Sequence, residues 1–407
     1  MTITQCRATW IRLNFRILLM TAPRQRLLTP GPTAVPKAVL REMALPMIHH
    51  RTAEFRAIFA ELTERLGRLF GTVHPVLCIT GSGTTAFEAA QVSLAVVGST
   101  VITASGGKFG ERWQDIYDIY APALEIKNVK IAVPWGRPVD PTLLQQTLEA
   151  HPDTSVVTVV HSETSTATAS DLRRIAEIVH RSDALLVADG ITAVGALPLE
   201  MDEWGIDVVI TGSQKALMLP PGLGYVGLGP RALQRLEQQK PRGSYNLDLR
   251  RWLASWHDQD VPFTPPVSLI RAQRVALEMI ESEGLANVQK RTVALAAATR
   301  AALKAMGLKL ISVSPSDSLT GAYYPAGVAD GPFRKALRQN HSIHIAGGQK
   351  GRGADWSGKI FRISHMGYID ATDTCAALEA IETELIAAGA PIKAGTALDA
   401  ANATLGK

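Results

Sequence analysis

Short runs of apolar, β-favouring residues alternate with helical stretches between about residues 75 and 230, and this alternation constrains the fold more than any other feature. Continuous apolar strands of this kind are buried on both faces, which is typical of a parallel sheet covered by helices. The sequence therefore predicts an α/β domain with a mostly parallel central sheet, and ligands of such folds bind at the carboxyl ends of the strands. The expected strands are Pro75–Thr80, Ser99–Ala104, Ser155–His161, Ala184–Asp189, Val208–Thr211 and Gly224–Gly229.

Helix patterns surround these strands and continue beyond them. Glu54–Phe70 reads as a strong amphipathic helix before the sheet, and 142–151 and 171–181 read as crossover helices. A long helical pattern from Leu269 to about Leu303 is followed by shorter strand and helix patterns as far as Ala388. The second half of the chain therefore predicts a smaller C-terminal α+β domain.

We divide the chain into an N-terminal extension (1–26), a large domain (27–285), a small domain (286–390) and a tail (391–407). The tail is rich in Ala, Gly and Thr, so we expect it to be frayed. The extension is rich in arginine but lacks the unbroken apolar centre of a secretory signal. We expect it to be poorly ordered; a transit peptide and a true start at Met20 are the alternatives.

Composition limits the classes of protein that fit. Of 407 residues, 46% are hydrophobic and 19% are charged, which excludes wholesale disorder. The net charge of +5 comes without a basic stripe, which argues against nucleic-acid binding. Three scattered cysteines predict neither a disulfide framework nor a metal site, and no apolar run reaches the ~18 residues of a membrane span. We therefore expect a cytoplasmic protein with no metal, no nucleic-acid partner and no membrane partner.

A glycine-rich string follows the first expected strand and opens a helix. In Gly81–Ala86 the glycines let the backbone approach a ligand, and the free N–H groups of the helix start favour an anion. The string also matches G-x-G-x-x-A, a dinucleotide fingerprint that wants an acidic residue about 20 positions later. The next strand ends at 103–107 without a carboxylate. A single phosphate is therefore the better ligand, and an ordinary glycine turn is the alternative.

Two further residues with chemical potential stand at strand ends. Asp189 could cap a helix, bind a metal or pair with a buried cation. Lys215 precedes an apolar stretch, and a lysine in such surroundings becomes a nucleophilic amine suited to Schiff-base chemistry. A lysine at the rim of the sheet is the alternative. Together, a phosphate cup, a strand-end Asp and a strand-end Lys are what pyridoxal phosphate requires.

These features resemble the class V aminotransferases, which are pyridoxal-phosphate enzymes of fold type I, and in particular their alanine/serine–glyoxylate aminotransferase group. The matching strings occur in the family order and cover about residues 27–388. They are Leu27–Thr33, His49–Thr52, Gly81–Thr84, His161–Thr166, Ala188–Gly190, Gly212–Leu217 and Phe361–Gly367.

The resemblance implies a role for each matching position around the cofactor. Lys215 is similar to the lysine that forms the Schiff base, and Asp189 to the partner of the pyridinium nitrogen. Phe109 lies where the family stacks an aromatic ring on the cofactor, although many relatives have Trp or Tyr there. Thr164 is similar to a hydroxyl near the O3′ atom. The phosphate cup implied by the resemblance is formed by Ser82, Gly83, Thr84 and Gln214.

The resemblance also implies contacts with the substrate and with a second subunit. Arg362 is similar to the residue that binds the α-carboxylate, which suits a guanidinium because its fork matches a carboxylate. Pro30 and Gly31 resemble a loop that lies over the same site. Thr264 resembles a phosphate contact from the neighbouring subunit, so a homodimer is expected.

The activity implied is ping-pong transamination from alanine or serine to a 2-oxo acid, glyoxylate by resemblance. Aspartate is an alternative donor, for which Arg51 offers a second cation, and ureidoglycine is another. Cysteine desulfurization is discounted because Cys375 lies in a helix pattern and Cys78 in a buried strand. A nicotinamide dehydrogenase is discounted because the sequence lacks the acidic residue that would bind the ribose. The intact set of Lys215, Asp189 and Arg362 argues against a non-catalytic cofactor-binding module.

Overall fold

The central sheet has seven strands in the order β2-β10-β9-β8-β5-β3-β4. β10 runs antiparallel to both of its neighbours, and every other pairing in this sheet is parallel. The mostly parallel α/β fold is thereby confirmed. The strands are β2 (Val76–Thr80), β3 (Thr100–Ser105), β4 (Lys127–Ala132), β5 (Thr154–Val160), β8 (Leu185–Asp189), β9 (Val208–Gly212) and β10 (Leu223–Leu228).

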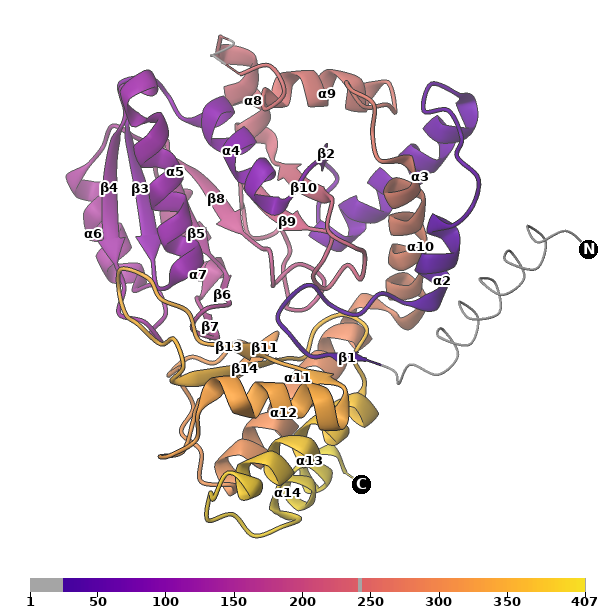
Figure 1. The fold of residues 1–407 in the computed structure, drawn as a ribbon. Coiled ribbons are helices and arrows are strands. Elements are labelled where there is room, and N and C mark those ends of the chain that lie inside the picture. The colour runs from indigo at the N-terminus through magenta and orange to yellow at the C-terminus, as the bar shows by residue number, and fades with distance from the viewer. Residues whose placement is uncertain (1–24, 241–243, 407) are drawn as a thin grey trace, which may run out of the picture.

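The computed structural model describes residues 25–240 and 244–406. Helices pack around the central sheet, and the smaller C-terminal part lies below it in the view of Figure 1. No helix within these ranges is both long and apolar enough to cross a membrane. The helices around the sheet are α2 (Lys37–Met43), α3 (Ala53–Phe70), α4 (Gly83–Leu94), α5 (Lys108–Leu124), α6 (Pro141–Ala150), α7 (Leu172–Val179), α8 (Pro230–Gln238), α9 (Leu249–His257) and α10 (Val267–Glu283).

Helix α3 illustrates how local sequence signals set these elements. The Thr52 side chain accepts a hydrogen bond from the Phe55 backbone N–H and so caps the first turn. Gly71 ends the helix with a φ of 64°, a left-handed conformation that glycine adopts without a Cβ penalty. Phe55, Phe59 and their neighbours on the apolar stripe are buried in the main core. Each such side chain contributes roughly 1.5–3 kcal/mol of burial free energy.

The chain enters the fold beside the small C-terminal part. β1 (Arg26–Leu27) pairs in parallel with β12 (Ile343–His344), and Arg26 forms an ion pair of 2.9 Å with Asp373. The expectation of a poorly ordered extension reaching residue 26 is therefore wrong at its last residue. Residues 1–24 of that prediction lie outside the described residues.

The C-terminal part has its own sheet, in the order β11-β14-β13, and its own hydrophobic core around Phe361, Ile363 and Ile381. The strands of this sheet are β11 (Leu319–Tyr323), β13 (Ala346–Gly347) and β14 (Ile360–Ser364). The helices of the C-terminal part are α11 (Leu285–Ala305), α12 (Asp330–His341), α13 (Ala371–Ala387) and α14 (Thr396–Leu405). A short hairpin of β6 (Ser162–Glu163) and β7 (Thr168–Ala169) lies nearby (Figure 1).

Two expectations for this half of the chain are corrected. The helix expected from Leu269 to Leu303 is broken at Gly284, whose φ of 85° interrupts it between α10 and α11. The tail is not frayed between residues 396 and 405, because α14 packs on α11 and buries Ala397 and Ala401. The division into domains at residue 285 stays a prediction, which the break at Gly284 supports.

Candidate active site

Lys215 lies just after β9 with its amine buried beneath the N-terminal segment. Its Nζ donates a hydrogen bond of 2.5 Å to the Pro30 carbonyl oxygen. Gly31 follows with a φ of 120°, and a Cβ added there would collide with the Lys215 Nζ. Burial lowers the pKa of Lys215 to about 8, and the positive charge of Arg362 adds to this effect. A neutral amine is therefore accessible near physiological pH.

Asp189 ends β8 as a fully buried carboxylate. Its Oδ1 accepts a hydrogen bond of 3.0 Å from the Ile191 backbone N–H, and its Oδ2 accepts one of 3.1 Å from the Trp113 indole N–H. Burial raises the pKa of Asp189 to about 7 despite these two donors. No lysine or arginine in the described ranges forms an ion pair with it. A buried carboxylate of this kind fits the cation of a protonated pyridine nitrogen.

The start of α4 has the features of an anion site. The backbone N–H of Ser82 donates to the Thr85 hydroxyl at 3.3 Å, while the amides of the first turn point out of the helix. A Cβ at Gly83 would lie 2.4 Å from the tip of the Ile191 side chain, so a larger residue there would have to displace that side chain. Nearby, the side-chain Oε1 of Gln214 is buried without a hydrogen-bond partner in the described part of the chain. The oxygen itself is an acceptor, but a half-turn of this side-chain amide presents its NH2 group, which can donate to a phosphate oxygen.

Phe109 lies in the first turn of α5, and Glu163 fixes that turn. The buried Glu163 carboxylate accepts hydrogen bonds from the backbone N–H groups of Phe109 (3.1 Å) and Gly110 (3.0 Å). The guanidinium of Arg112 lies 4.9 Å from the centroid of the Phe109 ring and donates to the Thr84 hydroxyl at 3.2 Å. One side of α5 therefore faces both the expected phosphate cup and the expected position of the cofactor ring.

Arg362 on β14 presents a prepared guanidinium fork. Its Nε and Nη2 donate to the Gly347 carbonyl at 3.1 and 2.7 Å, and its Nη1 donates to the Thr164 carbonyl at 2.8 Å. A guanidinium has five N–H groups, so one remains on each terminal nitrogen. Burial lowers the pKa of Arg362 to about 10, which still leaves it charged at neutral pH. The fork can therefore bind a carboxylate with two hydrogen bonds.

Two other candidates lie outside this group. Thr264 is exposed between α9 and α10, and no hydrogen bond among the described residues joins it to the surroundings of Lys215. Arg51 forms an ion pair of 2.8 Å with Asp260 and donates to the Val261 carbonyl at 2.9 Å. Neither residue is brought to the group around Lys215 by contacts within its own chain.

Three residues of the site had no role assigned from the sequence. They are Arg112, Trp113 and Glu163, which contact Thr84, Asp189 and the start of α5. Arg112 and Trp113 follow Phe109 by three and four positions, which places all three on one side of a helix. This spacing is visible in the sequence, but no helix was expected over 108–124.

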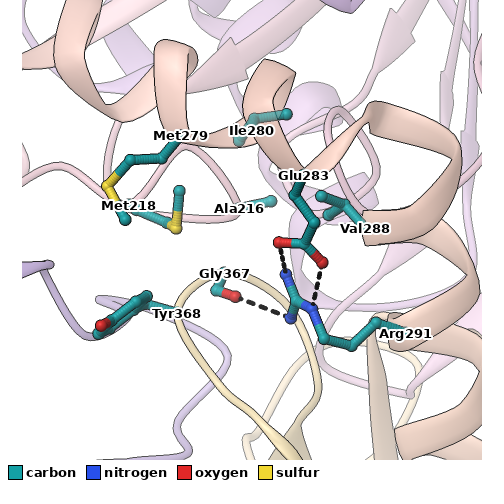
Figure 2. Close-up of a pocket in the computed structure, with 9 residues that line it drawn as sticks. All are labelled: Ala216, Met218, Met279, Ile280, Glu283, Val288, Arg291, Gly367 and Tyr368. Atoms are coloured by element: carbon teal, nitrogen blue, oxygen red, sulfur yellow. Dashed lines mark hydrogen bonds and ion pairs between the residues drawn. The ribbon is translucent and has the colours of Figure 1, made fainter.

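A small cavity of about 60 Å³ lies behind Lys215, bordered by the following turn and by α10 and α11. Figure 2 shows the Arg291 guanidinium at one side of this cavity, where it donates to the Glu283 carboxylate and the Gly367 carbonyl. Arg291 also donates to the Ile369 carbonyl at 2.8 Å. Because a carboxylate and two carbonyls already engage this arginine, Arg362 is the better candidate for a substrate carboxylate. Within residues 25–240 and 244–406, no cluster of His, Cys, Asp and Glu could hold a metal ion.

Comparison with known proteins finds similarity over most of the chain. Residues 27–366 match the family described as aminotransferase class-V. The chain is 33% identical to an L-aspartate–glyoxylate aminotransferase of Paracoccus denitrificans, covering 91% of this chain and 94% of that one. It is 32% identical to a serine–glyoxylate aminotransferase of Methylorubrum extorquens, covering 94% and 96%. The crystal structure of a ureidoglycine–glyoxylate aminotransferase from Bacillus subtilis superposes with a TM-score of 0.87 at 28% identity, covering 95% and 99%.

Proposed function

The chain belongs to the class V aminotransferase family, whose cofactor is pyridoxal phosphate, and from that premise we propose that it moves an amino group from alanine or serine to a 2-oxo acid, glyoxylate above all. The observation that carries this proposal is the fork of Arg362 in the same buried region as the amine of Lys215. The electrostatic influence of Arg362 on the pKa of Lys215 supports their proximity. A substrate with an α-carboxylate next to an amino group matches this pair.

Each residue of the group has a distinct task in the proposed reaction. Pyridoxal phosphate supplies a carbonyl carbon that takes up the amino group and a ring that withdraws electrons from the Cα–H bond. The neutral Nζ of Lys215 removes the Cα proton of the bound donor and holds it. The ionised carboxylate of Asp189 keeps the ring nitrogen protonated, because a buried negative charge favours a cation beside it. Arg362 orients the substrate through its α-carboxylate.

The arrangement of cations near the site supports an amino-acid donor whose side chain is small and uncharged. A dicarboxylic donor such as aspartate needs a second cation, and Arg51 is engaged by Asp260. Arg112 is directed to Thr84 and lies over Phe109, on the side of the expected phosphate. Among the described residues, this leaves Arg362 as the cation placed for a substrate carboxylate. The donor is therefore proposed to carry a single carboxylate.

Aspartate and ureidoglycine remain second candidates, because relatives of similar identity are named for them. A screen of single half-reactions separates the possibilities. The enzyme loaded with pyridoxal phosphate is mixed with one amino acid at a time, and the change of the cofactor absorbance is followed without an acceptor. Fast conversion by alanine or serine supports the proposal, and faster conversion by aspartate or ureidoglycine overturns the choice of donor.

We also propose that the active form is a cytoplasmic homodimer. Thr264 is exposed, and no hydrogen bond among the described residues joins it to the surroundings of Lys215 in its own chain. Such a position suits a residue that reaches the phosphate of a second subunit. Cys78 and Cys375 are free, which suits a reducing compartment. Light scattering of the active enzyme tests the assembly, and full activity in a monomer would exclude it.

A further inference from the structure

The indole N–H of Trp113 donates to the buried carboxylate of Asp189 at 3.1 Å. Both side chains are almost completely buried, at 1% and 3% exposure. The indole ring is held by packing, because its centroid lies 4.3 Å from that of Phe87 and 6.5 Å from that of Tyr117. The donor therefore reaches Asp189 from a ring with little freedom to move.

We propose that Trp113 is a positioning residue that fixes the orientation of the Asp189 carboxylate toward the cofactor ring. This inference rests on the proposed function, in which Asp189 is the partner of the ring nitrogen. The terminal torsion of an aspartate side chain is broad, so the carboxylate does not select one orientation by itself. The Ile191 backbone N–H holds Oδ1, and Trp113 holds Oδ2. With one donor on each oxygen, the plane of the carboxylate is set before any ligand arrives.

The second effect of this hydrogen bond is on charge. A donor to an ionised carboxylate favours the ionised form, and Trp113 is one of the two hydrogen-bond donors that lower the pKa of Asp189 against the larger effect of burial. Loss of the indole N–H leaves the Ile191 amide as the remaining donor. A protonated Asp189 has no negative charge to offer to a ring cation.

The helix that carries Trp113 is fixed at its start from two directions. Glu163 accepts the backbone N–H groups of the first turn. On the other side, the Glu111 carboxylate accepts the backbone N–H groups of Arg352 (2.9 Å) and Gly353 (3.0 Å), which belong to the loop before β14. Phe109 and Trp113 are one turn apart on this helix. The contact with the expected cofactor face and the contact with Asp189 are therefore set by one rigid element.

The test uses Trp113→Phe, which removes the N–H and keeps an aromatic ring against Phe87. The matched control is Tyr117→Phe, which removes a polar atom from the same buried stack one turn later. The Tyr117 hydroxyl is not a donor to Asp189. The charged groups acting on Asp189, which are Glu163, Arg112 and Lys215, are unchanged in both variants.

The first measurement is made on the protein without cofactor. Carboxyl carbons of labelled aspartate are titrated by NMR, and the Asp189 signal is identified by its absence in Asp189→Asn. We expect Trp113→Phe to raise the titration midpoint of Asp189 by about one to two pH units, since a hydrogen bond to a charged group has this strength. Tyr117→Phe should leave the midpoint in place. An unchanged midpoint in folded Trp113→Phe would overturn the inference while leaving the proposed function intact.

The second measurement is made on the loaded enzyme. Trp113→Phe should lower kcat about tenfold and leave KM unchanged, because the fork at Arg362 is not touched. If the midpoint shifts while the rates of this variant and of Lys215→Ala both stay normal, the proposed function fails and the contact between Trp113 and Asp189 stands. If Trp113→Phe does not fold, 3-benzothienylalanine at position 113 keeps the shape and replaces only the N–H with sulfur. The same titration then decides the question.

Discussion

Replacing Asp189 with Asn removes the buried negative charge and keeps the shape of the side chain. In the protein without cofactor, burial raises the pKa of Asp189 from 3.8 to about 7. A carboxylate with a raised pKa in the folded state makes the protein less stable as pH rises from the unfolded to the folded pKa. The wild-type apoprotein should therefore lose stability between about pH 4 and pH 7, and Asp189→Asn should lack this loss.

The size of the effect follows from the two pKa values. A difference of about three pH units corresponds to ~4 kcal/mol once Asp189 is fully ionised. Asn has one acceptor oxygen for the two donors Ile191 and Trp113, so one N–H loses its partner at a cost of ~1 kcal/mol. The net gain of the variant is ~3 kcal/mol at pH 8 and below ~1 kcal/mol at pH 5. For a chain of 407 residues, the gain at pH 8 raises Tm by about 4 °C.

The assay is thermal unfolding of both apoproteins at several values between pH 5 and pH 8. The difference in Tm should grow with pH and level off above about pH 7. With pyridoxal phosphate bound, the more stable variant should be the less active enzyme. In Asp189→Asn the ring cation loses its partner, so we expect the rate to fall by about 100-fold or more relative to wild type. A Tm difference that stays constant across this range would refute the argument that Asp189 is a buried, uncompensated charge.

Three other substitutions test the rest of the site. Lys215→Ala should abolish transamination and the visible absorbance of the lysine-bound cofactor; a variant that keeps both would contradict the assignment. Arg362→Lys should lower kcat/KM about 10- to 100-fold for amino acid and oxo acid alike, with cofactor occupancy unchanged by absorbance, because a point charge replaces a fork. Gly31→Ala should slow turnover through its clash with the Lys215 amine, and steady-state rates equal to wild type would show that the loop is free to move away.

The elements that the sequence predicted correctly are those with an unambiguous apolar pattern. The six expected strands are present with no end shifted by more than one residue, because each is a continuous buried run. β4 was missed, since Lys127–Ala132 mixes polar and apolar residues and lies at the edge of the sheet, where one side of the strand has no neighbour. The break at Gly284 was also missed, because a single glycine is compatible with a continuous helix.

Helix α5 is the most consequential omission. Its segment contains Gly110 in the first turn and Pro122 near the end, and its apolar positions are occupied by large aromatic residues interrupted by charges. Those features weaken a helix pattern in the sequence. The structure explains the glycine, because a Cβ at Gly110 would lie 2.7 Å from the Ser105 backbone. Tertiary packing therefore stabilises a helix that its own residues predict poorly.

Some residues of the candidate site can be predicted from patterns in the sequence, and others are recognised only from their contacts in the structure. The positions of Lys215 and Asp189 at the carboxyl ends of strands were predictable because each borders a continuous apolar run, and parallel strands place these ends at one edge. The groups that hold them come from distant parts of the sequence: Trp113 is 76 positions from Asp189, and Pro30 is 185 positions from Lys215. No spacing rule connects such pairs. The residues proposed to react are thus visible in a single sequence, whereas the contacts that hold them require the fold.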